Sequence, residues 1–76
     1  MNKTRRAEIN ALISDLQSAK DRAKSIRDEE QEYLDNMPES LQSSERGEAA
    51  QEAVSNLEYA TDAFDDLIQN LEDAAG

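Results

Sequence analysis

Residues 36–48, Asn-Met-Pro-Glu-Ser-Leu-Gln-Ser-Ser-Glu-Arg-Gly-Glu, decide the fold of this 76-residue chain. They contain its only proline, Pro38, and its only internal glycine, Gly47. Proline interrupts the interior of a helix but is tolerated in its first turn. We therefore predict that one helix ends before this segment and that another begins within it.

The segment also carries helix-start signals. Its Asn-Met-Pro-Glu sequence has the pattern of a cap, a first-turn proline and a carboxylate, which favours a short helical turn through Gln42. Ser43 or Ser44 then caps the second long helix, with glutamates near its positive dipole end. Gly47, which costs about 1 kcal/mol relative to alanine in a helix, is either tolerated at a frayed start or required by close approach of another backbone.

Apolar residues on both sides of the turn recur in alternating steps of three and four, a heptad pattern. Before the turn they are Ile9, Leu12, Leu16, Ala19, Ala23, Ile26, Tyr33 and Met37, with Glu30 in the one skipped position. After the turn they are Ala50, Ala53, Leu57, Ala60, Phe64, Leu67, Leu71 and Ala74. We predict an all-α, single-domain helical hairpin of residues 1–76, with helices over 4–35 and 43–74 and a turn over 36–43.

A short connection makes the two helices antiparallel neighbours of coiled-coil type. Aligning the two apolar rows about the turn pairs Ile9 with Leu71, Leu16 with Phe64, Ala23 with Leu57, and Glu30 with Ala50. In this alignment Glu30 is a polar residue that fixes register, one turn from Arg46. A second interpretation makes Glu30 a partner contact at the turn end.

Ile13, Val54 and Ile68 lie beside these rows and widen the apolar stripe beyond what one helix covers. Chains this short also need a disulfide, a metal or another subunit. We therefore predict pairing of two hairpins into a dimeric four-helix bundle. The predicted oligomer interface consists of Ile9, Ile13, Leu16, Val54, Phe64, Ile68 and Leu71.

The composition argues against an enzyme or a metal protein. The chain has no cysteine and no histidine, so it lacks thiolate ligands and the commonest general base. Adjacent acids on a helix point about 100° apart and do not converge on one atom. Neither a calcium-loop pattern nor a glycine-rich phosphate loop is present. We expect no catalytic residues, no cofactor and no metal.

The charge is divided along the chain. Residues 1–27 carry seven basic and three acidic residues, +7 − 3 = +4, and residues 28–76 carry one and fifteen, +1 − 15 = −14, which gives the net −10. We expect the basic end to lie back along Asp65, Asp66, Glu72 and Asp73. Net −10 disfavours direct nucleic-acid binding. Without a signal peptide or an apolar span, we expect a cytoplasmic location and no membrane association.

Tyr59 is predicted to point outward among acidic residues, and exposed aromatic residues in a polar rim are enriched at binding surfaces. Alternatively, it lies on its own helix or packs on a second hairpin. The acidic faces are either solvated surface or a row of carboxylates that imitates nucleic-acid phosphates. The predicted partner-binding residues are Tyr59, Glu52, Glu58, Asp62, Asp65, Asp66, Glu29, Glu32 and Tyr33.

The stretch from Asp28 to Glu48, with its Glu-Tyr-x-Asp-Asn-x-Pro-Glu-x-Leu-Gln-x-Ser-Glu turn, resembles small acidic helical-hairpin proteins of bacteriophages and prophages. The resemblance covers the helical layout of most of the chain and implies no reaction. It implies a phage-encoded module that binds, and in its sharpest form inhibits, a host protein such as a defence factor, in the host cytoplasm. Two alternatives stay open: a nucleic-acid mimic, and a small structural or assembly component of a phage.

Overall fold

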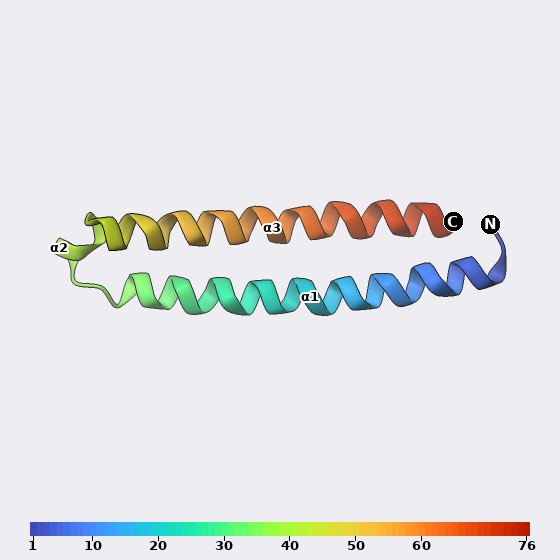
Figure 1. The fold of residues 1–76 in the computed structure, drawn as a ribbon, viewed down its shortest axis with the longest axis horizontal. Helices are drawn as coiled ribbons and strands as arrows, with labels where there is room; N and C mark the ends of the chain where they lie inside the picture. Colours follow the sequence, from blue (N-terminus) through green and yellow to red (C-terminus); the bar gives the residue numbers. More distant parts are fainter.

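The computed structural model describes all 76 residues and contains only helices (Figure 1). They are α1 (Lys3–Asp35), the single-turn α2 (Glu39–Gln42) and α3 (Glu45–Ala75). α1 and α3 run antiparallel, so both termini lie at one end of the molecule and α2 lies at the other (Figure 1). The all-α class, the pair of long helices and the helical turn through Gln42 are confirmed, with helix ends within two residues of those predicted. The predicted cap is wrong, because Asn36 caps the end of α1 and Pro38 is the N-cap of α2 rather than a residue of its first turn.

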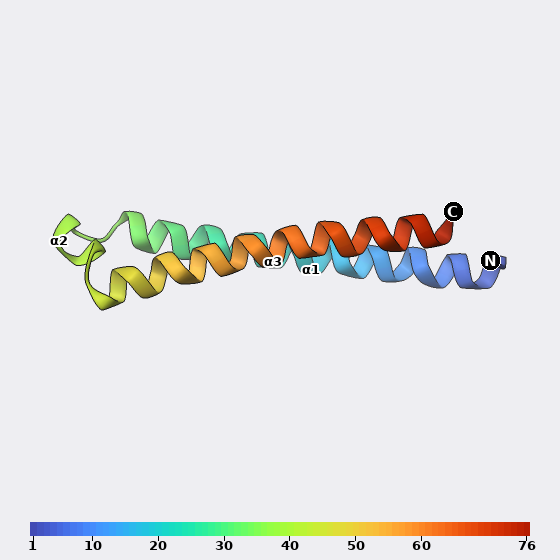
Figure 2. The ribbon, with the colours of Figure 1, turned by 90° about the horizontal axis from the view of Figure 1, so that it is seen from above.

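The hairpin is a rod that is one layer of helices thick. Its extents are 58 × 15 × 12 Å, and α1 and α3 cross at a shallow angle (Figure 2). The radius of gyration is 17.2 Å, whereas a compact domain of this length has roughly 11 Å. The accessible surface is 5569 Å², against roughly 4,700 Å² for a compact monomer of this mass. One chain therefore leaves far more surface in contact with water than a closed core would.

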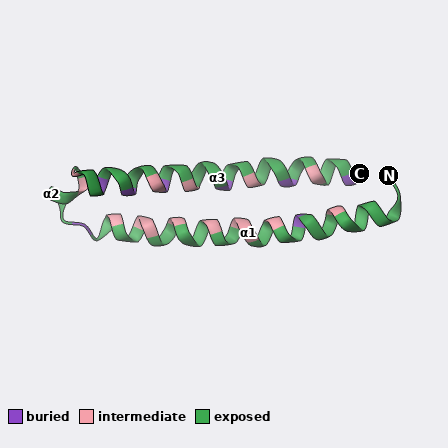
Figure 3. Cartoon of the chain, viewed as in Figure 1, coloured by how far each residue is buried: buried purple, intermediate pink, exposed green.

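The buried side chains lie where α1 and α3 face each other (Figure 3). We call this row of contacts the seam, and its members recur in steps of three and four. On α1 and just after it, the buried or half-buried seam residues are Ile9, Ile13, Leu16, Lys20, Ala23, Arg27, Glu30, Leu34 and Met37. On α3 they are Gly47, Ala50, Val54, Leu57, Thr61, Phe64, Ile68, Leu71 and Ala75.

The seam is rotated by one position from the predicted rows. Ile13, Val54 and Ile68, predicted beside it, are buried within it at 8, 7 and 8% exposure. In exchange, six residues assigned to the predicted rows are exposed: Leu12, Ile26, Tyr33, Ala60, Leu67 and Ala74. The apolar stripe of α3 spans three positions per heptad, that of α1 does so except at Lys20, Arg27 and Glu30, and one partner helix buries only two of the three positions. The periodicity alone therefore did not determine which two are buried.

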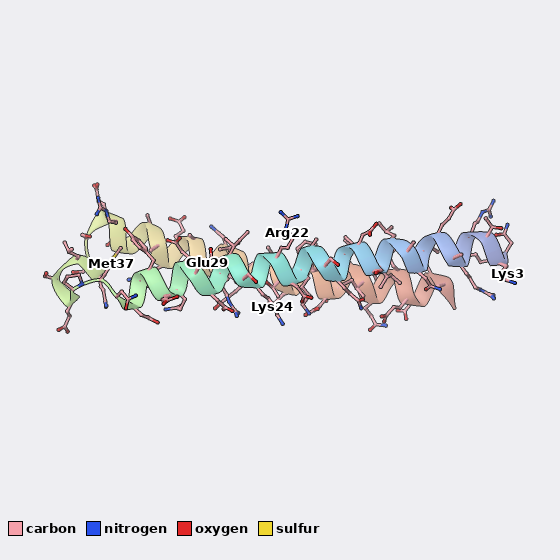
Figure 4. The ribbon with its side chains drawn as sticks, turned by 90° about the horizontal axis from the view of Figure 1, so that it is seen from below. Lys3, Arg22, Lys24, Glu29 and Met37 are labelled. Atoms are coloured by element: carbon pink, nitrogen blue, oxygen red, sulfur yellow. The ribbon has the colours of Figure 1, made fainter.

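The helices are also shifted along each other by about one turn. The Lys20–Asp65 ion pair joins residues whose numbers sum to 85, so residues of α1 and α3 lie opposite each other when their numbers sum to about this value. In the predicted alignment, the residue numbers of opposite residues sum to 80. Glu30 is therefore level with Ser55 rather than Ala50, and it forms no ion pair with Arg46. As a consequence, the first turns of α1 extend past the end of α3, and Lys3 lies beyond that end (Figure 4).

The shift arises in the connection, where α2 packs against the start of α3. The carbonyl of Pro38 accepts hydrogen bonds from the backbone N–H groups of Leu41 (2.8 Å) and Gln42 (3.2 Å). The Gln51 side chain donates to the Gln42 carbonyl (3.1 Å). Met37, the last seam residue before α2, is buried beneath this turn.

Gly47 explains how closely the turn approaches α3. A Cβ atom at this position would lie 2.2 Å from the Gln42 carbonyl oxygen and 2.6 Å from that of Leu41. Both are backbone atoms that cannot rotate away. Of the two interpretations of this glycine, close backbone approach is therefore the one that the structure bears out. Ser44 caps the helix here, with its side-chain oxygen accepting from the Gly47 N–H (3.4 Å).

We predict that Gly47→Ala lowers the free energy of unfolding by about 1–3 kcal/mol, the usual cost of overpacking. Intrinsic helix propensity alone predicts the opposite sign, a gain of about 1 kcal/mol. Urea denaturation followed by circular dichroism at one fixed protein concentration measures the difference. Ser55→Ala, on the exposed face of α3, is the control and should be neutral or slightly stabilising. A stabilised Gly47→Ala variant would contradict the close approach.

Candidate protein-interaction surfaces

An apolar row runs along one side of the seam. The residue immediately before each of Ile13, Lys20, Arg27 and Leu34 on α1 is apolar, and the equivalent residues on α3 are apolar too. The two antiparallel helices are related by an approximate two-fold axis perpendicular to the plane that contains both helix axes. Residues at the same heptad position of α1 and α3 therefore lie on the same side of the seam. We call this row the apolar flank, and it consists of Leu12, Ala19, Ile26, Tyr33, Ala53, Ala60, Leu67 and Ala74.

The opposite side of the seam is polar throughout. Its equivalent row, the polar flank, consists of Asn10, Gln17, Lys24, Gln31, Gln51, Glu58, Asp65 and Glu72. Figure 4 shows Arg22, beside the apolar flank, and Lys24, on the polar flank, at opposite edges of α1. The hairpin therefore has one polar face and one face with an exposed apolar row.

The exposed fraction of the side chains of α3 increases from the middle of the seam toward the apolar flank. On α3, Val54, Thr61 and Ile68 are buried, whereas the neighbouring seam residues Leu57, Phe64 and Leu71 are only half-buried. The next row outward, the flank itself, is mostly exposed. A shallow apolar hollow lies there, lined by Ala60, Ala63, Phe64 and Leu67. The apolar stripe thus extends past the contact with α1 and is left partly uncovered.

The residues of the predicted oligomer interface fall into two groups, one buried inside the hairpin and one half-buried beside the apolar flank. Ile13, Val54 and Ile68 already pack inside a single hairpin and offer almost no surface to another chain. The other predicted members, Ile9, Leu16, Phe64 and Leu71, are half-buried beside the apolar flank. Of the large flank residues, the sequence interpretation identified only Tyr33 as available for binding, because it had placed Leu12, Ile26 and Leu67 inside the hairpin. Their heptad recurrence beside the charged seam residues Lys20 and Arg27 was the signal that could have identified them.

The outer face of α3 is acidic and has one large aromatic side chain. Tyr59 is 70% exposed. Glu52 and Asp66 lie two turns from it on either side along the same face. The predicted partner-binding residues Glu58, Asp62 and Asp65 are also exposed and flank this line. α3 thus brings six of the predicted site residues together on one helix.

The predicted site residues of α1 do not join that face. Glu29 and Glu32 are exposed and lie level with residues 53–56 of α3, in the same half of the rod. However, the outward faces of the two helices point in opposite directions, because their inward faces meet at the seam. Tyr33 belongs to the apolar flank and is 46% exposed. The predicted set therefore divides between separate surfaces.

The two ends of the rod differ in charge. Residues 28–48, around the turn, carry Arg46 and eight acids, 1 − 8 = −7. The first turn of α1, capped by the Asn2 side chain accepting from the Arg5 N–H (2.8 Å), carries Lys3, Arg5 and Arg6. These cations oppose the helix dipole, at about 0.3–1 kcal/mol each. One end is thus strongly acidic and the other carries a basic extension.

The basic residues of α1 do not form the predicted series of pairs with the acids of α3. The pair between the helices is Lys20–Asp65, with the two side chains 21 and 54% exposed, and Arg27 pairs with Asp28 on its own helix. The overhang of α1 carries Lys3, Arg5 and Arg6 past the level of Glu72 and Asp73. The shifted register is the physical reason for this difference.

No group of three or more acidic side chains is arranged to hold a metal ion. None of the helices combines the length and the apolarity that crossing a membrane requires.

The chain shows no significant similarity to known proteins in three comparisons: no family model matches it, and neither a curated protein nor a solved structure does. Its function is therefore inferred from the surfaces described above.

We predict that Asp65→Asn lowers the free energy of unfolding by about 0–1 kcal/mol at low salt, because it removes the pair with Lys20. The loss should shrink at high salt as the interaction is screened. Asp66→Asn is the matched control, since it removes the same charge from the adjacent position without breaking a pair. Urea denaturation at two salt concentrations provides the measurement. Equal effects of both substitutions would show that the pair contributes nothing.

Proposed function

We propose that this hairpin is a non-enzymatic protein-interaction module that binds a basic surface of another protein through the outer acidic face of α3. The observation that carries the proposal is Tyr59, a tyrosine 70% exposed and set among carboxylates. Tyrosine supplies large contact area and is enriched among the residues that dominate binding energy. The surrounding carboxylates would steer a basic partner and set its orientation.

The proposed partner is a host protein, and the chain is proposed to be phage-encoded. The support is the resemblance of residues 28–48 to the turn of small acidic phage and prophage proteins. Binding over an acidic face would occlude a functional surface of the partner, and a defence factor that handles nucleic acid has a basic surface of the required kind. Inhibition in the host cytoplasm is the specific form of this proposal.

A second candidate is a nucleic-acid mimic. Glu58, Asp62 and Asp66 follow one another at one-turn intervals, about 5–6 Å along the helix axis, and all three are exposed. Such a row would occupy a nucleic-acid groove mainly by charge, so its binding would depend steeply on salt. The tyrosine-centred module differs because part of its binding energy comes from an aromatic contact, which salt screens little.

Self-pairing into a four-helix bundle is part of the proposal. Only 8 of the 76 residues are buried, and no large side chain is fully buried. A core this small rarely supplies more than about 3–5 kcal/mol. A second hairpin would supply the missing burial while leaving the outer face of α3 free for the protein partner.

The test is capture of proteins from a bacterial host lysate on the immobilised chain, with washes at low and moderate salt and identification by mass spectrometry. For the tyrosine-centred module we expect a partner that survives moderate salt and is lost with Tyr59→Ala. For the mimic we expect a partner lost at moderate salt and with the combined Asp62→Asn, Asp65→Asn and Asp66→Asn substitutions. Ser55→Ala is the control on the same helix. Captured proteins that none of these substitutions affects would contradict both candidates.

A further inference from the structure

We propose that a second copy of this chain packs on the apolar flank, with the turns of the two copies at opposite ends of the resulting bundle. This inference rests on the proposed self-pairing and specifies its face and its orientation. The observations that support it concern the apolar flank, the placement of acids on α3, the available area and the charge of the two ends.

The apolar flank is the more apolar of the rows that border the seam contact. The seam row that α1 buries against α3 includes Lys20 and Arg27, whereas the flank contains no polar residue at any of its positions except the tyrosine hydroxyl. Its large members are 44–53% exposed: Leu12 at 45%, Ile26 at 53%, Tyr33 at 46% and Leu67 at 44%. Because this regular apolar row stays exposed to water after the hairpin forms, another layer of helices could pack on it and bury it.

The acids of α3 are arranged so that another acidic chain can approach along the α3 half of this side, whereas the equivalent row beside the flank on α1 carries Glu8, Asp15, Arg22 and Glu29. The row next to the flank on α3 is uncharged and consists of Ala49, Asn56, Ala63 and Asn70. None of the nine acidic residues of α3 falls in this row or on the flank. Elsewhere around α3, two chains of net charge −10 would bring carboxylates together. Small alanine side chains also allow close approach of helix backbones.

The area of this face fits a stable dimer. The rod measures 58 by 15 Å across this face, a projected area of about 870 Å², close to the roughly 800 Å² per partner of a standard protein interface. The half-buried seam residues Leu57, Phe64 and Leu71 border the flank and would point toward the centre of a four-helix bundle. A second copy would therefore complete the burial that α1 begins.

The charges at the two ends of the rod favour the orientation in which the turns of the two copies lie at opposite ends of the bundle. If both turns lay at one end, two segments of net charge −7 would be neighbours. With the turns at opposite ends, the overhanging Lys3, Arg5 and Arg6 of each copy lie beside the acidic turn segment of the other. These cations have no ion-pair partner within their own chain. Both arrangements are closed by a two-fold axis and so end at a dimer, which leaves charge as the feature that distinguishes them.

The orientation is tested on the purified chain by electron–electron distance measurement. Because the chain contains no cysteine, a spin label on Ser40→Cys, exposed in α2, reports only the distance between the two turns. We expect about 50 Å, near the 58 Å length of the rod. A distance of about 20–25 Å, two helix diameters, would place the turns together and overturn the orientation. A monomer by sedimentation would overturn the inference and leave the flank to a different occupant.

The face is tested by sedimentation of Leu67→Glu, with Ser55→Glu as the matched control that adds the same charge to the outer side of α3. We expect Leu67→Glu to weaken dimerisation about tenfold or more, as for a central interface residue, and Ser55→Glu to leave it unchanged. Ala60→Glu is a second flank variant, and circular dichroism confirms that each variant remains helical. Equal effects at Ser55 and at both flank positions would overturn the choice of face. Because no lysate protein enters these measurements, their outcome is separate from that of the partner capture.

Discussion

The structure depends on one constraint: α3 carries an apolar stripe three positions wide per heptad, α1 carries a similar stripe interrupted by Lys20, Arg27 and Glu30, and in each case the neighbouring helix covers only two of the three positions. Val54, Thr61 and Ile68 are buried, Leu57, Phe64 and Leu71 are half-buried, and the flank beyond them is exposed. The rod shape, the large accessible surface and the absence of any fully buried large side chain all follow from this mismatch. The proposed second copy would cover the part of the apolar stripe that a single hairpin leaves exposed.

Charge is distributed around this apolar stripe in a way that separates two roles. The acids of α3 avoid the flank and the row beside it, which leaves the α3 half of that side free for association, whereas the row beside the flank on α1 carries Glu8, Asp15 and Glu29. They gather instead on the outer face, around the exposed Tyr59. The proposed self-pairing and the proposed partner binding therefore use different sides of the same helix and do not compete for surface.

The sequence predicted the fold class, the two long helices and the turn, because a single proline and a single internal glycine interrupt two heptad runs. It did not predict the rotation of the seam, since both two-row choices look apolar on α3, and on α1 the row that is buried, with Lys20 and Arg27, looks the less apolar of the two. It also missed the register, which depends on how α2 packs over Gly47, a tertiary contact with no pattern in the sequence. The exposure of Tyr59 and its acidic neighbours agrees with the sequence interpretation, whereas their role in binding stays a prediction.

One hairpin leaves part of its apolar stripe uncovered, and we propose that a second copy covers it. The most direct test is the thermal unfolding midpoint measured by circular dichroism over a wide range of protein concentrations. Folding coupled to dimerisation predicts a midpoint that rises steadily with concentration. A midpoint that is the same at every concentration, for a fully helical chain, would contradict the account.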